Sequence, residues 1–173
     1  MLLIGGTGFA GCHMQELLDS EYKVMTAGSS TDIRDFEKVM TLIRECRPDY
    51  VVNLASITTV KESFANPFDT YDIGVYGTLN LLISLKQIEF KGRMLNISSS
   101  EVYGHPDKEQ LPITEDLRAK PLSPYAVNKI STEALCYQWS QSESFEIVTA
   151  RPFTHIGPGQ SERFSISNFA KQI

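Results

Sequence analysis

Apolar and polar positions alternate along this chain in two patterns. Short apolar runs predict buried strands, and they occur at residues 2–4, 22–26, 50–55, 93–98 and 146–150. Between these runs, apolar residues recur every three or four positions, which predicts helices. One follows the first strand and ends near residue 19, and the others cover residues 36–46, 69–87 and 125–141. Strands that alternate with helices through short links predict an α/β fold with a doubly wound parallel sheet, the Rossmann fold.

Length and composition are those of one globular domain, with 173 residues, 42% of them hydrophobic, and a net charge of −5. The negative charge argues against nucleic acid or an anionic membrane as a partner, and no apolar run is long enough to cross a bilayer. Three widely spaced cysteines and three scattered histidines predict neither a disulfide framework nor a metal site. The N-terminus lacks the features of a signal peptide, so we expect a cytoplasmic location.

A glycine-rich loop follows the first predicted strand and opens the first predicted helix. Its glycines are Gly5, Gly8 and Gly11, in the spacing G-x-x-G-x-x-G. Such glycines allow a tight turn and let the backbone approach a pyrophosphate, whose charge the helix N-terminus stabilises. The loop therefore predicts dinucleotide binding, and a loop that only packs tightly is the alternative.

Asp32 lies about 20 residues beyond the last glycine, where an acid can hold the ribose 2′-hydroxyl of NAD. However, the expected end of the second strand, residues 26–30, holds no acid. Asp32, which stands before an apolar residue, could therefore contact the adenine instead, and NADP(H) is favoured over NAD(H). A helix N-cap at Asp32 or Asp35 is the alternative that involves no ligand.

Tyr125 and Lys129 are spaced to lie one turn apart on the same face of a helix. An ammonium there favours the phenolate, so we expect a lowered pKa of Tyr125 and proton exchange with an alcohol or carbonyl oxygen. The serines 98–100 follow a predicted strand at the carboxyl edge of the sheet, where such folds bind ligands. A serine-rich turn is the alternative. Residues 151–160 reach the same edge, and we expect His155 among them to be structural.

The chain resembles the extended branch of the short-chain dehydrogenase/reductase superfamily, which acts largely on nucleotide sugars. The resemblance covers essentially the whole chain, because the segments that carry it fall in that family's order. They are the glycine loop, Asp32-Ile33, residues 53–56, 98–104, 124–129 and 151–153. Within that branch, residues 134–139 and 151–164 resemble most closely the GDP-4-dehydro-6-deoxy-D-mannose reductases, which make GDP-D-rhamnose.

This resemblance implies reduction of the C4 keto group of a GDP-4-keto-6-deoxy sugar by NAD(P)H. Tyr125 would be the general acid, Lys129 would bind the nicotinamide ribose, and Ser99 would stabilise developing charge. The residues implied in cofactor binding are Gly5, Thr7, Gly8, Phe9, Gly11, Asp32, Ile33, Leu54, Ala55, Ser56, Tyr125, Lys129 and Pro152. Those implied in substrate binding are Ser99, Ser100, Glu101 and Thr154.

Three departures from the family pattern bear on these implications. Glu101 is a fourth catalytic candidate, because it stands where related 4,6-dehydratases carry the glutamate that removes the C5 proton. A 4,6-dehydratase or 4-epimerase with bound NAD(P) is therefore the enzymatic alternative. Thr154 replaces an asparagine that usually contacts the nucleotide sugar, and a strand usual between Ala27 and Asp32 is expected to be short or missing. The alternative that is not an enzyme is a non-catalytic dinucleotide-binding scaffold. The presence of both Tyr125 and Lys129 argues against it, because family members of that kind commonly lose one of them.

The organisation of the whole chain follows from the same pattern. We expect residues 1–160 to form the dinucleotide-binding domain and residues 161–173 to begin a substrate-binding region whose remainder is missing. The element that starts at Phe164 ends without a cap or a closing strand, which suggests a fragment of a longer protein. Apolar residues beyond one narrow stripe on the helices 69–87 and 125–141 predict a homodimer.

Overall fold

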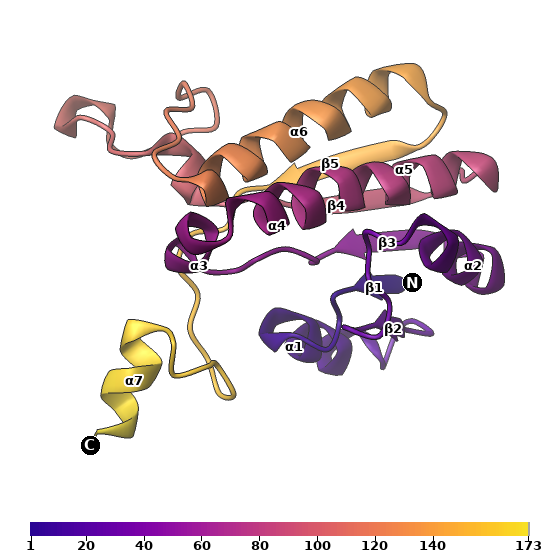
Figure 1. The fold of residues 1–173 in the computed structure, drawn as a ribbon, viewed down its shortest axis with the longest axis horizontal. Helices are drawn as coiled ribbons and strands as arrows, with labels where there is room; N and C mark the ends of the chain where they lie inside the picture. The colour runs from indigo at the N-terminus through magenta and orange to yellow at the C-terminus, as the bar shows by residue number, and fades with distance from the viewer. Residues whose placement is uncertain (173) are drawn as a thin grey trace.

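The five predicted strands form one parallel sheet in a computed structural model that describes residues 1–172 (Figure 1). The strands are β1 (Leu2–Ile4), β2 (Met25–Ala27), β3 (Tyr50–Asn53), β4 (Arg93–Ile97) and β5 (Glu146–Ala150), in the spatial order β2-β1-β3-β4-β5. All four strand pairs are parallel. The predicted doubly wound parallel sheet is confirmed, and no further strand lies between Ala27 and Asp32.

The helices cover both faces of this sheet. They are α1 (Phe9–Leu18), α2 (Phe36–Cys46), α3 (Val60–Ala65), α4 (Pro67–Tyr71), α5 (Gly77–Gln87), α6 (Pro124–Ser142) and α7 (Ser165–Lys171). A π-helical turn, η1 (Asp72–Tyr76), joins α4 to α5, and two 3₁₀ turns, η2 (Ser100–Tyr103) and η3 (Lys108–Gln110), follow β4. The chain runs outward from β1 to β2 and then reverses toward β5, so right-handed connections place α1 opposite α2, α5 and α6 (Figure 1).

Two predicted elements differ from those observed. The second strand begins at Met25 rather than Tyr22, because the N–H groups of Glu21 and Tyr22 bond to the Leu18 carbonyl and extend the end of α1 as a turn. The helix expected over residues 69–87 is instead three consecutive elements, α4, η1 and α5. The short helix α3 was not predicted, since six residues are too few to display a helical period.

Polar caps fix where the helices near the predicted site begin. The Asp35 side chain accepts a hydrogen bond from the Lys38 N–H at 3.2 Å and caps α2, so the N-cap alternative is confirmed for Asp35. The Ser123 hydroxyl accepts from the Ala126 N–H at 3.1 Å, and Pro124 occupies the first turn of α6. The cap at Ser123 thus sets the starting point of α6, the helix that carries Tyr125 and Lys129.

The core lies mainly between the sheet and the layer formed by α2, α5 and α6. Its largest fully buried side chains include Leu2, Met40, Ile43, Leu81, Leu82, Leu85 and Met94. The edge strand β5 is less well covered, since its Val148 is 47% exposed. The sheet is therefore better buried at β1 and β3 than at β5, and the glycine loop starts at the end of β1.

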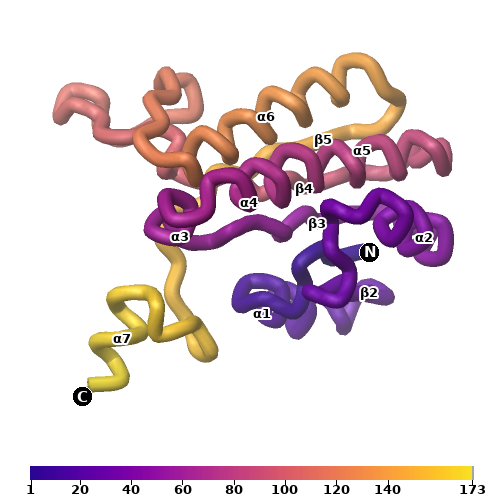
Figure 2. The backbone as a smooth tube through the Cα atoms, in the orientation of Figure 1, coloured from indigo at the N-terminus to yellow at the C-terminus, as the bar shows by residue number. Residues whose placement is uncertain are grey.

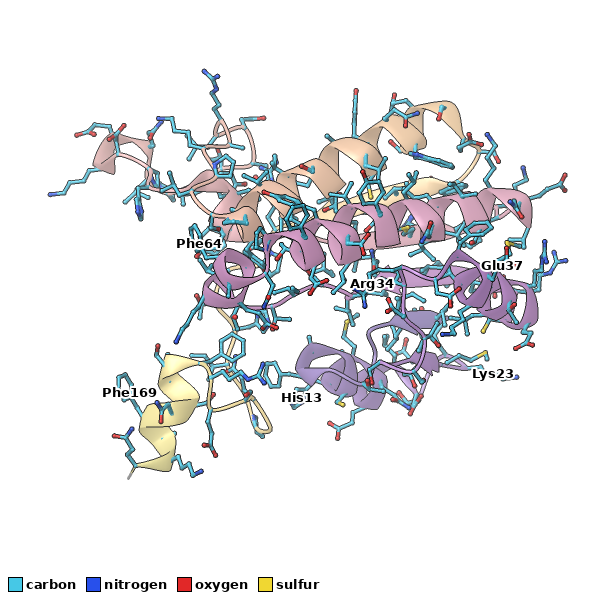
Figure 3. All side chains as sticks on the ribbon, viewed as in Figure 1. His13, Lys23, Arg34, Glu37, Phe64 and Phe169 are labelled. Carbon is cyan, nitrogen blue, oxygen red and sulfur yellow. The ribbon has the colours of Figure 1, made fainter. Side chains whose placement is uncertain are left out.

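The segment after β5 leaves the sheet and crosses to the side of α1, as the tube in Figure 2 shows. His13 of α1 points toward this segment (Figure 3), and its Nε2 lies 2.9 Å from the Pro158 carbonyl oxygen. The chain then forms α7, apart from the sheet (Figure 1). Ile173, the end of the predicted amphipathic element, lies outside the described residues. Within residues 1–172, no helix combines the length and apolar character that a membrane span requires.

Candidate active site

The glycine loop lies where the direction of the sheet reverses. Gly5 has a φ of +75°, and a Cβ added there would lie 3.0 Å from the Ala55 nitrogen, in the loop that follows β3. The backbones of the loops after β1 and β3 are therefore in direct contact. Open parallel sheets bind ligands at this position, beyond the carboxyl ends of the strands where the strand order reverses. This contact brings together three residues predicted to bind the cofactor, Gly5, Leu54 and Ala55.

The other two glycines shape the start of α1. A Cβ on Gly11 would lie 2.4 Å from the Gly6 carbonyl oxygen, so the helix packs on the loop without a side chain between them. Gly8 is the N-cap, and no side chain caps α1 within the described chain. The first N–H groups of the helix therefore stay available, and a pyrophosphate fits such a site through its charge and its acceptor oxygens.

Tyr125 and Lys129 lie at the start of α6 as predicted, with the Lys129 Nζ 5.6 Å from the centre of the Tyr125 ring. The Lys129 ammonium donates to the Ile97 carbonyl oxygen at the end of β4, at 2.8 Å. The Tyr125 N–H donates to the Ser63 hydroxyl of α3 at 3.0 Å. These contacts thus hold the Tyr125 backbone against α3 and the Lys129 side chain at the carboxyl end of β4.

Ser99 and Glu101 are brought to the same place by the turn that follows β4. The Ser99 hydroxyl accepts from the Glu101 N–H at 3.2 Å and caps the turn η2. Ser99 is only 8% exposed, and both its hydroxyl and the Glu101 carboxylate influence the titration of Tyr125. The four catalytic candidates predicted from the sequence are therefore neighbours.

The predicted effect of Lys129 on Tyr125 is wrong for this structure, because the pKa of Tyr125 is raised rather than lowered. Burial of the phenol is the main cause, the Ser99 hydroxyl acts in the opposite direction, and the Glu101 carboxylate adds to the increase. Burial also lowers the pKa of Lys129, to about 8. Tyr125 is therefore a protonated phenol at neutral pH, which suits a proton donor.

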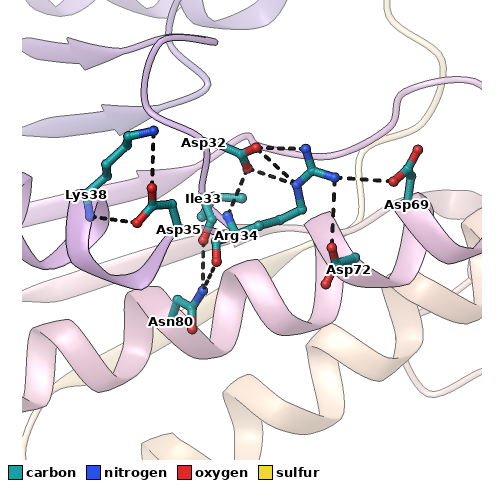
Figure 4. Close-up of polar contacts among 8 residues, drawn as sticks. All are labelled: Asp32, Ile33, Arg34, Asp35, Lys38, Asp69, Asp72 and Asn80. Atoms are coloured by element: carbon teal, nitrogen blue, oxygen red, sulfur yellow. Dashed lines mark hydrogen bonds and ion pairs between the residues drawn. The ribbon is translucent and has the colours of Figure 1, made fainter.

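The Asp32 carboxylate forms an ion pair with Arg34, which was not predicted from the sequence. The Arg34 Nη2 lies 2.7 Å from one carboxylate oxygen of Asp32, and its Nε donates to both oxygens (Figure 4). These hydrogen bonds hold the pKa of Asp32 below its usual range. The same guanidinium lies 3.2 Å from Asp69 and 3.8 Å from Asp72. Asp32 is thus a paired carboxylate rather than a free one.

The segment from Asp32 to Arg34 is also fixed to α5. The Asn80 side chain donates to the carbonyl oxygens of Ile33 and Arg34, at 3.1 and 2.9 Å (Figure 4). Ile33 is 4% exposed, and a Cβ on Gly77 would lie 2.4 Å from its Cγ2. Ile33 therefore packs into a notch that only a glycine leaves open.

A second network supports the serine turn, and its centre is Glu133, which was not predicted as a site residue. The Glu133 carboxylate pairs with Arg151 through Nε at 2.9 Å and Nη2 at 2.6 Å, and it accepts a hydrogen bond from Ser98. Arg151 Nη1 in turn donates to the Tyr103 hydroxyl at 2.9 Å. Glu133 lies four residues beyond Lys129, and that spacing on the same helix face was the available signal.

Two predicted residues, Pro152 and Thr154, lie on the segment after β5, and two others, Ser100 and Phe9, lie against it. The Pro152 carbonyl oxygen accepts from the Ser100 N–H at 3.0 Å, which ties this segment to the serine turn. Thr154 is exposed. His155 stacks on Phe9 with ring centres 6.0 Å apart, so a predicted cofactor residue of α1 is covered by this segment.

Comparison with known proteins places this geometry in a family. Residues 29–173 match the family model described as GDP-mannose 4,6 dehydratase. The chain is 40% identical to GDP-6-deoxy-D-mannose reductase of Pseudomonas aeruginosa over 176 aligned residues, which cover all of this chain and 58% of that relative. The chain thus spans little more than half the length of this relative.

Solved structures agree with this result. The structure of RMD from Pseudomonas aeruginosa complexed with NADPH matches with a TM-score of 0.90 at 40% identity, over 99% of this chain and 59% of that one. UDP-glucose 4-epimerase of Thermus thermophilus in complex with NAD matches with a TM-score of 0.87 at 26% identity, over 98% and 60%. The chain therefore belongs to the GDP-mannose 4,6 dehydratase family, within the extended short-chain dehydrogenases/reductases.

Proposed function

We propose that the native protein is a nucleotide-sugar 4-ketoreductase that reduces a GDP-4-keto-6-deoxy sugar with NADPH. The observation that carries this proposal is the convergence of Ser99, Tyr125 and Lys129 in a chain whose glycine loop leads into a helix without a side-chain cap. The similarity to a GDP-6-deoxy-D-mannose reductase supports the same reaction and the same kind of substrate. Residues 1–160 would bind the dinucleotide, and residues 161–173 would begin the region that binds the sugar nucleotide.

The nicotinamide, when bound, supplies the hydride that reduces the C4 carbonyl. Tyr125 protonates the alkoxide oxygen that results, and its raised pKa keeps that proton in place at neutral pH. The Ser99 hydroxyl donates to the same oxygen as charge develops on it. The Lys129 ammonium, held by the Ile97 carbonyl, binds the nicotinamide ribose and faces the Tyr125 ring.

NADP(H) is the proposed cofactor, and the pairing of Asp32 with Arg34 supports it. A free carboxylate near the adenosine ribose would repel a 2′-phosphate, whereas a carboxylate paired with a guanidinium repels it less. The complex of RMD with NADPH supports the same choice. NAD remains the alternative, as in the related epimerase structure.

The 4,6-dehydratase is the second candidate, because Glu101 acts electrostatically on Tyr125. A dehydratase recycles its bound dinucleotide, whereas a reductase consumes a reduced one. The two functions therefore differ in net redox change.

Incubation of the native protein with GDP-4-keto-6-deoxymannose and NADPH tests the proposal. We expect NADPH oxidation, and we expect Tyr125→Phe to lower its rate by roughly 10²–10⁴-fold with the NADPH dissociation constant nearly unchanged. Tyr22→Phe is the matched control, because Tyr22 is 40% exposed and lies in the turn after α1, on none of the elements that carry the catalytic candidates. Conversion of GDP-mannose to the keto sugar without net redox would identify the protein as a dehydratase instead.

We also propose that the protein forms a homodimer through α3, α4, η1 and α6. These elements contact one another, and each presents a large exposed aromatic side chain. The exposed fractions are 60% for Phe64, 90% for Phe68, 61% for Tyr76 and 69% for Tyr137. A set of exposed aromatics on adjoining elements is typical of an interface.

A further inference from the structure

A small polar cavity borders Lys129, between α6, η1 and the ends of β3 and β4. Its volume is about 10 Å³, at the lower limit for one water molecule. The polar side chains around it include Asn53, Ser56, Thr78, Asn96, Asn128 and Lys129. A cavity with this lining suits a water molecule rather than an apolar group.

Two asparagines at this cavity are buried with polar atoms unpaired. Asn96 is 2% exposed and Asn128 is 1% exposed. Within the described residues, Asn96 Nδ2 and both polar atoms of the Asn128 carboxamide have no protein partner. Asn53 differs, because it donates to the Thr78 hydroxyl at 3.1 Å and accepts from the Ala55 N–H at 3.3 Å. Unpaired buried amides are costly, so Asn96 and Asn128 require a ligand.

The Asn128 carboxamide also fits against a glycine on the facing element. A Cβ added to Gly74 would lie 2.0 Å from the Asn128 Oδ1. Gly74 is the middle residue of the π-helical turn η1, and π-helical turns occur frequently at functional sites. The side chain next to Lys129 in sequence therefore occupies the space that any other residue at position 74 would fill.

We propose that Asn128 is a positioning residue, which holds one buried water molecule together with Asn96 and locks α6 against Gly74. The Lys129 ammonium uses one of its three donors on the Ile97 carbonyl. The water accepts from Asn96 Nδ2 and from Lys129, and it donates to the Asn128 carboxamide oxygen. Asn128 thereby holds the Lys129 ammonium in place. The last step rests on the proposed function, in which Lys129 binds the dinucleotide.

The water site is tested by magnetisation transfer from water to side-chain amides in NMR spectra of the native protein. We expect transfer to the Asn96 and Asn128 amides with the sign of a long-lived bound water. In Asn128→Leu, which is similar in size but apolar, the transfer to Asn96 is expected to disappear. Absence of transfer to both amides in the wild-type protein would overturn the water site.

The contact with Gly74 is tested by a double-mutant cycle on the urea midpoint of unfolding. Gly74→Ala should lower the midpoint clearly in the wild-type background and much less in Asn128→Ala, which removes the clashing carboxamide. Gly77→Ala is the matched control, since its Cβ would meet Ile33 rather than Asn128, and its effect should be the same in both backgrounds. Equal effects of Gly74→Ala in both backgrounds would overturn the lock.

The positioning role is tested by NADPH titration. We expect Asn128→Leu to weaken NADPH binding about tenfold, the equivalent of one charge-assisted hydrogen bond, and Asn128→Ser, which can still bond the water, to weaken it less. Unchanged affinity in Asn128→Leu would overturn the positioning role. A wild-type protein that fails to bind NADPH but shows the water and the coupling would refute the proposed function and leave the water site standing.

Discussion

At the scale of single residues, burial decides the protonation states around Tyr125. The phenol keeps its proton because burial disfavours the phenolate more than the Ser99 hydroxyl favours it. Lys129 is buried as well, so it loses part of its preference for the charged form. A spacing of four residues predicts the contact between these side chains but not the dielectric environment that they share.

The burial of Lys129 predicts a pH-dependent stability. Its pKa of about 8 in the folded state lies below the ordinary lysine value, so the unfolded chain binds more protons between about pH 8 and 10.5, and stability rises with pH across that window. We expect the free energy of unfolding of Lys129→Met, relative to wild type, to fall by about 2 kcal/mol between about pH 7 and 9.5.

Urea unfolding at the two pH values measures this difference. Lys171→Met serves as the control, because Lys171 is exposed and pairs with Glu162 at the surface. A relative stability of Lys129→Met that stays constant over the window would show that Lys129 titrates as an ordinary lysine.

The ion pair of Arg34 with Asp32 should influence the preference for NADPH over NADH. Arg34→Ala leaves the Asp32 carboxylate without its partner, so we expect NADPH affinity to fall roughly two- to fivefold relative to NADH affinity. The dissociation constants of both dinucleotides measure the ratio. Lys38→Ala removes the same charge from the start of α2 but leaves Asp32 paired, since Lys38 contacts Asp35. A ratio that changes equally in both variants would assign the effect to net charge alone.

At the scale of elements, the glycines of the loop have separable roles. A Cβ on Gly11 would collide with the Gly6 carbonyl, whereas a Cβ on Gly8 would meet its nearest neighbour, the Gly5 carbonyl oxygen, at 3.3 Å. The helix α1 therefore requires Gly11 in order to pack on the loop. We expect Gly8 to be needed for a different reason, the close approach of a pyrophosphate to the helix N-terminus.

Alanine substitutions should distinguish these two roles. We expect Gly11→Ala to cost about 1–3 kcal/mol of stability and to lose dinucleotide binding as a consequence. Gly8→Ala should keep most of the stability and still lose binding, because its methyl group covers the N–H groups of α1. Unfolding curves and NADPH titrations of both variants measure this contrast. Intact binding in Gly8→Ala would show that the pyrophosphate lies elsewhere.

At the scale of the whole molecule, the exposed aromatics predict an assembly. We expect the native protein to be a dimer in light scattering at micromolar concentration, and Phe68→Glu to make it a monomer by placing a charge in the interface. Leu17→Glu is the control, because Leu17 is 75% exposed on α1, on the other face of the sheet. A monomeric wild-type protein, or equal effects of both variants, would contradict the proposed interface.

The sequence by itself determined which segments form strands and main helices and how these follow one another along the chain, because hydrophobic periodicity is a local property of the chain. The helix α2 begins and ends at the predicted residues, and so does β5, since their apolar spacing and flanking signals lie within a few residues. The parallel sheet followed from the alternation of these elements. The nearness of Ser99 to Tyr125 followed from their positions after a strand and at a helix start.

Only the tertiary structure decided the partners that come from distant segments. The raised pKa of Tyr125, the ion pair of Arg34 with Asp69, and the network of Glu133 with Arg151 depend on burial and on contacts between elements. The fit of Asn128 against Gly74 joins residues 54 positions apart, on two helical elements, and no local pattern marks it. Local periodicity fixes which residues face inward, whereas packing and desolvation fix which of them meet and in which charge state.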